Sequence, residues 1–300
     1  MQAVWMVLSA LVFSTMAVCV KVAAAYFNNA ELVFYRGLIG VVFLAIFARL
    51  RGTSLATKVL PMHIWRSVVG VMALSTWFYA IAHLPLATAM TLNYMSSVWI
   101  ATFLVGGTLM FSKAGQRIPS QGPLVLTILT SFVGVVMLLR PTMGQDQSFA
   151  GMVGLLSGLG AAFAYMQVMV LARTGEPETR TVFYFAVGTA VAGALGMAVV
   201  GVSPWAWQQG LWLLPIGLLA SLGQLCMTKA YSMSTNHGGT LMVANLQYSG
   251  IVFSAIFSLL LFGDHIPLIG WAGMALIILS AIAATVLRAR AAPNAPAEDH

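Results

Sequence analysis

Long apolar runs alternate with short polar loops over almost the whole chain. A helix needs roughly 20 apolar residues to cross the hydrocarbon core, so these runs predict ten membrane-spanning helices. The predicted spans are residues 3–25, 32–48, 64–83, 87–109, 122–139, 151–172, 182–200, 211–233, 239–262 and 268–287. The remaining residues, 288–300, are rich in Ala and Pro and predict a disordered tail.

Composition places the chain in one class. Only 7% of its residues are charged and 60% are hydrophobic, whereas about 25% of a soluble domain is charged. The fold class is therefore that of an all-α integral membrane protein, which lies in the lipid bilayer.

The net charge of +7 would suggest a nucleic-acid partner if the protein were soluble. Here the basic residues lie in short loops, so we expect no nucleic-acid partner. Cys19 and Cys226 lie in different spans, which predicts buried thiols rather than a disulfide.

The distribution of basic residues predicts the orientation. If the N-terminus is cytoplasmic, the inner loops and the end of the last span hold nearly all of them: Arg49, Arg51, Lys58, Arg66, Lys113, Arg117, Arg173, Arg180, Arg288 and Arg290. Among the loops on the opposite side, only Arg140 is basic. The positive-inside rule then places both termini on the cytoplasmic side. We predict that the membrane is a bacterial inner membrane. The first apolar run lacks a basic leader segment and is interpreted as a retained span.

Two short patterns recur at the same separation. Leu-Ser-Ala-Leu at residues 8–11 resembles Leu-Ser-Gly-Leu at 156–159, and Ile-Pro-x-x-Gly at 118–122 is repeated at 266–270; both pairs are 148 positions apart. A common shift indicates an internal duplication.

The duplication divides the chain into a first half, residues 1–140, and a second half, residues 141–287. Each half holds five spans. Because five is odd, the second half enters the membrane from the opposite side, which gives a five-plus-five inverted repeat. Transporters use this arrangement to alternate access to a site near the bilayer midplane.

Polar and aromatic side chains are concentrated in residues 77–110 and again in residues 224–262. Polar atoms at this depth are costly unless they face protein or a water-filled cavity, so the two stretches predict a solute pathway. The candidate substrate-binding residues are Trp77, Tyr79, His83, Asn93, Tyr94, Ser97 and Trp99, followed by Gln224, Lys229, Tyr231, Asn245 and Tyr248. The repeat places Tyr79 and Lys229 at corresponding positions, so both are expected to approach one cavity.

Structural roles are open for several of these residues. Ser and Thr in spans commonly bond to their own helix backbone. His83 fits an interfacial position, and Trp77 and Trp99 fit packing as well as they fit lining. Lys229 fits snorkelling to the membrane surface or binding a substrate carboxylate.

Acidic residues are nearly absent from the spans. Glu31 lies at the edge of the second span, near Arg36, and the two predict a structural ion pair. A transporter of cationic drugs needs a buried carboxylate, and none is evident. Aromatic rings, amides and hydroxyls suit a neutral or zwitterionic solute with an apolar side chain, such as an amino acid.

Enzyme motifs are also absent. The sequence has no G-x-S-x-G, H-E-x-x-H or glycine-rich phosphate loop, and its carboxylates are too few for an acid–base pair or a metal site. We therefore predict that the protein is not an enzyme and needs no cofactor or metal.

Two motifs carry a family resemblance. Residues 31–37 read Glu-Leu-Val-Phe-Tyr-Arg-Gly, and residues 263–270 read Gly-Asp-His-Ile-Pro-x-x-Gly. With ten spans in two halves, the chain resembles the drug/metabolite transporter (DMT) superfamily, EamA type. Residues 113–117 depart from the pattern because they lack an acidic residue. The aromatic third and fourth spans most resemble the aromatic amino-acid exporter (YddG) branch.

This resemblance implies a secondary transporter that exports amino acids, aromatic and other neutral or apolar ones, by alternating access. A multidrug or other small-metabolite exporter of the same fold is the alternative. A lipid-handling membrane protein is a third hypothesis. The sequence leaves open the direction of transport, its coupling to protons, and the choice between monomer and homodimer.

Overall fold

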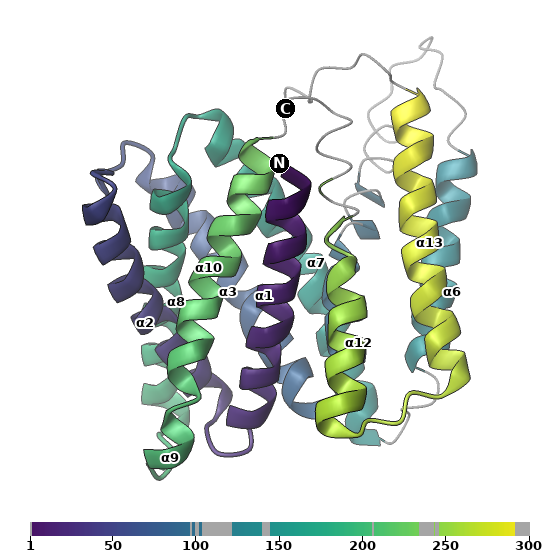
Figure 1. The fold of residues 1–300 in the computed structure, drawn as a ribbon, viewed down its shortest axis with the longest axis horizontal. Helices are drawn as coiled ribbons and strands as arrows, with labels where there is room; N and C mark the ends of the chain where they lie inside the picture. The colour runs from purple at the N-terminus through teal and green to yellow at the C-terminus, as the bar shows by residue number, and fades with distance from the viewer. Residues whose placement is uncertain are drawn as a thin grey trace.

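The computed structural model describes residues 2–96, 98–99, 102–103, 122–139, 145–205, 207–233, 243 and 246–291. Within these residues the regular structure is entirely helical (Figure 1). The helices are α1 (Gln2–Ala23), α2 (Asn29–Leu50), α3 (Leu60–His83), α4 (Leu86–Tyr94), α6 (Gly122–Leu139), α7 (Gln145–Arg173), α8 (Glu178–Val200), α9 (Trp207–Gly210), α10 (Leu213–Ser232), α12 (Ser249–Phe262) and α13 (Leu268–Ala291).

Six of these helices or helical stretches are long and apolar enough to cross a membrane, and shorter apolar segments lie in α6, α12 and α13. The structure moves several predicted ends. Helix α3 begins at Leu60, with a proline in its first turn, and not near residue 64. Helix α13 continues to Ala291, so the predicted tail begins later than residue 288. Helix α1 begins and α13 ends at the same end of the bundle (Figure 1), as the predicted placement of both termini on one side requires.

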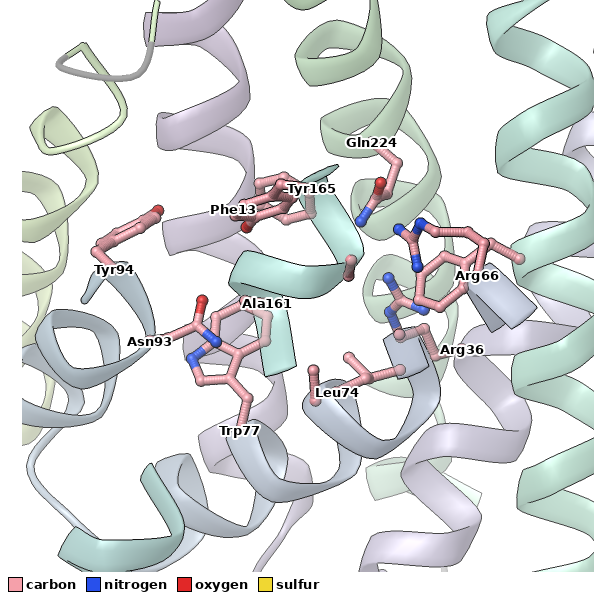
Figure 2. A pocket seen from close by; sticks show the side chains of 14 residues that line it. Phe13, Arg36, Arg66, Leu74, Trp77, Asn93, Tyr94, Ala161, Tyr165 and Gln224 are labelled. Carbon is pink, nitrogen blue, oxygen red and sulfur yellow. The ribbon is translucent and has the colours of Figure 1, made fainter. Parts of the chain in front are cut away.

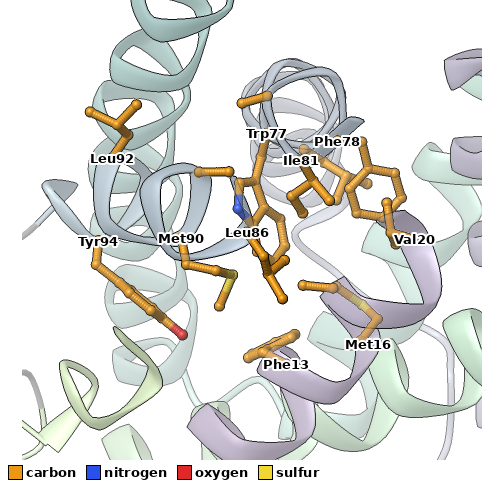
Figure 3. Close-up of a cluster of buried hydrophobic side chains, with 14 of the residues drawn as sticks. Phe13, Met16, Val20, Trp77, Phe78, Ile81, Leu86, Met90, Leu92 and Tyr94 are labelled. Carbon is orange, nitrogen blue, oxygen red and sulfur yellow. The ribbon is translucent and has the colours of Figure 1, made fainter. Parts of the chain in front are cut away.

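The helices pack in pairs that join distant parts of the sequence. Helix α2 packs along α8, α3 along α7, α1 along α10, α4 against α12, and α6 along α13. Figure 1 shows α6 and α13 standing together beside the other helices. Around α1, α3 and α4 the interior is filled by apolar side chains, among them Met16, Phe78, Leu86 and Met90 (Figure 3).

Small residues allow the closest approaches between helices. A Cβ atom added to Gly158 of α7 would meet the backbone carbonyl of Leu92 in α4. In the same way, Gly134 and Gly273 bring the backbones of α6 and α13 together. Without a strong hydrophobic drive inside lipid, such close backbone packing is a main source of helix association.

Two of the spans are interrupted. Helix α4 ends at Tyr94 and a turn at Met95 follows before helical residues resume at Ser96. In the span that ends with α12, Gln247 and Tyr248 form a turn immediately before Ser249. Discontinuous helices in corresponding positions of two halves are typical of transporter binding sites.

A candidate functional site: a cavity with two buried arginines

A cavity lies inside the bundle between the α2–α3–α8 region and the interruption after α4 (Figure 2). It is lined by Phe13, Arg36, Arg66, Gly70, Ala73, Leu74, Trp77, Asn93, Tyr94, Ala161, Ala164, Tyr165, Phe185 and Gln224. Helices α1, α2, α3, α4, α7, α8 and α10 all contribute. A site assembled from so many helices changes shape whenever any pair of them moves.

Two guanidinium groups form one wall of this cavity. Arg36 and Arg66 are only 4% and 3% exposed. At a rise of 1.5 Å per residue, Arg36 lies about 10 Å from the start of α2 and Arg66 about 9 Å from the start of α3. These starts are at opposite ends of the bundle, so both side chains meet in its middle. A charge at this depth costs about 2.5–3.5 kcal/mol on insertion scales, which makes a functional role the leading interpretation.

One aromatic ring supports both arginines. The Cζ atoms of Arg36 and Arg66 lie 5.2 Å and 4.2 Å from the ring centre of Phe185 in α8. Cation–π contact of this kind partly compensates a desolvated guanidinium. Nε of Arg36, and Nε and Nη1 of Arg66, have no hydrogen-bond partner among the described residues. Donors thus remain available at the cavity wall.

The opposite wall is neutral and aromatic. Trp77 of α3 and Asn93 and Tyr94 of α4 lie across the cavity from the arginines (Figure 2). The Asn93 amide donates to Oγ of Ser157 in α7 at 3.3 Å, which orients it. The indole Nε1 of Trp77 has no partner among the described residues. This wall offers an aromatic surface and hydrogen-bonding groups without charge.

Tyr165 and Gln224 complete the lining from the second half of the chain. The Tyr165 hydroxyl accepts a hydrogen bond from Nε2 of Gln247 at 3.1 Å. Gln247 belongs to the turn before α12, so this bond connects the interrupted span to the cavity. Gln224 of α10 lies near the arginines (Figure 2). Both halves of the chain therefore contact the same central space.

Gly70 sets the position of Arg66, and its replacement tests that position. A Cβ atom at Gly70 would meet Nη1 of Arg66 and, at 2.7 Å, the ring of Phe185. We expect Gly70→Ala to push the guanidinium away from the ring and to lower the initial transport rate about tenfold to a hundredfold, because a misplaced charged hydrogen bond loses about 1.5–3 kcal/mol. Thermal stability should fall moderately, because the buried ring of Phe185 must move as well as the flexible end of Arg66.

Initial rates in proteoliposomes measure the Gly70→Ala effect. Gly270→Ala in α13 is the matched control, because its Cβ would meet only side-chain carbons, the nearest a methyl group of Ile266 at 3.2 Å. Equal rates for Gly70→Ala and wild type would show that the position of Arg66 does not matter for transport.

The structure brings four of the twelve predicted substrate-binding residues to the cavity: Trp77, Asn93, Tyr94 and Gln224. Trp99 instead packs edge-on against Phe132 of α6, with ring centres 5.3 Å apart. Tyr248 is buried in the main apolar cluster, and Tyr231 packs against it. Ser97 and Asn245 lie outside the described residues.

Tyr79 and Lys229 do not approach one cavity. Tyr79 stacks on His83 at the end of α3, with ring centres 4.1 Å apart, and the edge of Phe149 packs against it. Lys229, near the end of α10, lies 3.6 Å from Glu178 at the start of α8, and half of its side chain is exposed. The two ends are on opposite sides of the bundle, because α8 begins beside the start of α3. Repeat-related positions were therefore a poor guide to side-chain contact.

The predicted ion pair between Glu31 and Arg36 is likewise not formed. The Glu31 carboxylate accepts hydrogen bonds from the backbone N–H of Asn28 and from both the N–H and the hydroxyl of Ser203. With Asn28 it forms a capping box at the start of α2. Arg36, more than one turn further on, turns into the cavity instead. Because the Glu31 carboxylate is hydrogen-bonded at the start of α2, Arg36 has no ion pair with it.

Charged clusters hold the two ends of the bundle. At one end, Lys21 Nζ lies 3.1 Å from Oδ2 of Asp264 and donates to the Leu84 carbonyl. The same Asp264 oxygen accepts from the Ser258 hydroxyl at 2.6 Å and from the Leu86 N–H at 3.4 Å. These contacts tie α1, the α3–α4 turn and the α12–α13 loop together.

At the opposite end, Glu176 connects the loops between α2 and α3 and between α7 and α8. Its carboxylate lies 3.0 Å from Nε2 of the buried His63 and accepts from Thr57 and Arg180. Burial of Glu176 opposes its ionisation, but the hydrogen bonds from His63, Arg180 and Thr57 outweigh this and lower its pKa. The carboxylate is therefore charged at neutral pH and fixes this end of the bundle.

Sequence reasoning missed Arg66, Tyr165, Phe185 and Phe13 as lining residues. Arg66 was counted with the basic residues of the inner loop because the third span was expected to begin near residue 64, which placed Arg66 in its first turn. The Pro61 signal for an earlier helix start, with Gly70 one turn beyond the arginine, would have indicated an internal position. For the aromatic residues no local signal exists, since apolar rings in a span are equally typical of packing.

The helical membrane bundle, its interrupted spans and its central polar cavity are together typical of a membrane transporter. A family model described as the EamA-like transporter family matches residues 1–106. The pseudopaline exporter CntI of Pseudomonas aeruginosa is 34% identical over 277 residues, which cover 92% of this chain and 93% of that protein. An uncharacterized transporter of Helicobacter pylori is 28% identical, covering 92% and 91%. A riboflavin transporter of Rhizobium johnstonii is 26% identical, covering 77% and 74%.

A solved crystal structure that shares the fold has a TM-score of 0.68 at 18% identity, and the match covers 97% of this chain and 98% of that chain. The chain therefore belongs to the EamA-like transporter family. This confirms the predicted superfamily, the ten-helix all-α membrane fold and the absence of an enzymatic role. Among the described residues, no cluster of His, Cys, Asp or Glu is placed to hold a metal ion.

Proposed function

We propose that this transporter exports small carboxylate-bearing metabolites, amino acids among them, across the bacterial inner membrane. The observation that carries the proposal is the pair of buried arginines, Arg36 and Arg66, facing Trp77 and Asn93 across one cavity. Guanidinium groups bind carboxylates through charge-assisted, often bidentate hydrogen bonds. The indole and amide of the other wall suit the remainder of an organic solute.

Alternating access accounts for the pairing of helices. If α1 corresponds to α7, α2 to α8, α3 to α10, α4 to α12 and α6 to α13, the exchange of halves maps α3–α7 onto α1–α10. It maps the other main packing pairs, α2–α8, α4–α12 and α6–α13, onto themselves. This supports the proposed division into an inverted repeat at about residue 140. The charged clusters around Asp264 and Glu176, one at each end, are then suited to close the cavity alternately. The positive-inside distribution supports cytoplasmic termini.

The relatives support export of a small molecule but differ in substrate, as the names pseudopaline exporter and riboflavin transporter show. Placement in the aromatic amino-acid exporter branch stays a prediction. A multidrug exporter of cationic compounds is disfavoured, because two guanidinium groups repel a cation from the cavity. A lipid-handling role would need a polar groove open to lipid, whereas both arginines are buried inside the bundle.

Flux into and out of proteoliposomes tests the proposal. The panel holds labelled phenylalanine, tryptophan, glutamate, a benzyl dicarboxylate and a cationic dye. We expect saturable, protein-dependent flux of the carboxylate-bearing compounds. The dye should show no flux above that of empty liposomes. If every carboxylate moves only at the protein-free rate, the proposed function is wrong.

A further inference from the structure

The charge of the cavity is unbalanced by the protein. Arg36 and Arg66 both line it, and none of its fourteen lining residues is an Asp or Glu. Ion pairs among the described residues involve Lys21, His63, Arg180 and Lys229, and neither cavity arginine. Buried charges are ordinarily paired, so the cavity lacks two negative charges.

From this imbalance we propose that the preferred substrate is a small organic dianion, whose two anionic groups bind Arg36 and Arg66 while its neutral remainder lies between Trp77 and Asn93. The inference rests on the proposed function and goes beyond it by naming the charge of the substrate. It also revises the expectation of a neutral or zwitterionic solute, which rested on the absence of a buried carboxylate and on the aromatic rings, amides and hydroxyls of the spans.

Geometry favours two separate anionic groups over one. The two guanidinium groups come from different helices and flank the same ring, with Cζ atoms 5.2 Å and 4.2 Å from the centre of Phe185. Each keeps at least one nitrogen without a partner among the described residues. A single carboxylate can satisfy one such fork bidentately, which leaves the other charge unpaired.

A zwitterion fits this site less well than a dianion. Its ammonium group needs an acidic or several neutral acceptors, but the lining offers only Asn93, Gln224 and two tyrosine hydroxyls. Among these acceptors, the Tyr165 hydroxyl already accepts a hydrogen bond from Gln247. In a low-dielectric cavity the ammonium would also be repelled by both guanidinium groups. The net charge of zero would leave the two positive charges uncompensated.

Three compounds that share one benzyl group isolate the effect of charge. Benzylmalonate is a dianion, hydrocinnamate a monoanion and phenylalanine a zwitterion, so the ring contacts are matched. In wild-type proteoliposomes we expect the ratio of initial rate to half-saturating concentration to be about tenfold or more higher for benzylmalonate than for either of the others. Phenyl phosphate, a dianion of another chemical source, tests whether carboxylates specifically are recognised.

The arginine variants then assign the preference to the cavity. Arg36→Gln and Arg66→Gln should each lower the benzylmalonate-to-hydrocinnamate ratio about tenfold while hydrocinnamate is still transported, because one positive charge remains. Arg51→Gln is the matched control. Its Cζ also lies 5.2 Å from a phenylalanine ring, that of Phe47, but at the exposed end of α2, so it should keep the wild-type ratio.

The outcomes separate the two proposals. Equal or better transport of phenylalanine than of benzylmalonate by the wild type overturns the dianion inference and leaves the proposed function standing. An unchanged ratio in both folded arginine variants also overturns it. If an arginine variant does not fold, the wild-type comparison alone decides. Absence of flux for every benzyl compound and for phenyl phosphate counts against both proposals.

Discussion

Asp264→Ala should open one end of the transporter. The substitution removes the acceptor for Lys21, Ser258 and the Leu86 N–H together. The carboxylate and the ammonium are 19% and 17% exposed, so the lost stability is about 1–3 kcal/mol, less than for a fully buried pair. We expect lower thermal stability and freer separation of α1 from the α12–α13 loop.

The native thiol of Cys19 reports this opening. Cys19 is buried, 5% exposed, in α1 two residues before Lys21. In a Cys226→Ser background, Cys19 should react several-fold faster with a membrane-impermeant maleimide when Asp264 is replaced by Ala than when Asp264 is present. Asp264→Asn should be intermediate, because the amide oxygen can still accept from Ser258 and Leu86.

Glu178→Gln provides the control at the other end of the bundle. It weakens the longer pair with Lys229, at 3.6 Å and with a lysine side chain 49% exposed. Exposed pairs contribute only about 0–1 kcal/mol, so Cys19 reactivity should be unchanged. An identical Cys19 rate with and without the Asp264 carboxylate would show that this cluster does not hold the end closed.

Gly37→Ala should cause the largest loss of stability. A Cβ atom at Gly37 of α2 would meet backbone N and Cα of Ala190, and the carbonyl oxygen of Ala186 at 2.9 Å, all in α8. Backbone atoms cannot turn aside, so α2 and α8 must separate. Overpacking of this kind costs about 1–3 kcal/mol and occasionally more. Transport should fall as well, because Arg36 is the preceding residue and Phe185 belongs to α8.

Unfolding of the purified protein in detergent on heating measures this effect. Gly270→Ala again serves as the control, since its nearest neighbour is a side-chain methyl group. Alanine also favours a helix over glycine by about 1 kcal/mol, so the control should be as stable as wild type or slightly more so. Matching midpoints for the two variants would contradict the close α2–α8 packing.

The sequence predicted the spans well where their position depends on the segment's own hydropathy and not on packing against other helices. Apolar runs found α1, α2 and α10 to within three residues, because insertion into lipid depends on the hydropathy of each segment alone. The starts of α3 and α8, which lie before the apolar run and follow or contain a proline, were less accurate. Helix α3 starts four residues earlier than expected, and this shift moves Arg66 from the first turn of a span to nearly two turns inside the helix.

Contacts between helices were harder to predict from the sequence. The pairing of Tyr79 with Lys229 followed from the repeat shift, yet these residues lie at opposite ends of the bundle. An inverted repeat places equivalent residues at equal depths measured from opposite membrane faces. Equivalent positions near helix ends are therefore far apart, whereas residues near the midplane can meet.

The sequence by itself determined the class of protein, the order of its spans and the near absence of acidic groups from the membrane interior. Those properties depend on each segment's transfer into lipid. Only the tertiary structure decided that Arg36 and Arg66 share the ring of Phe185 and face Trp77 and Asn93. The rotation and pairing of helices determine such contacts. That pairing depends on close packing between two helices at residues such as Gly37 and Gly70, so the sequence of one helix does not specify it.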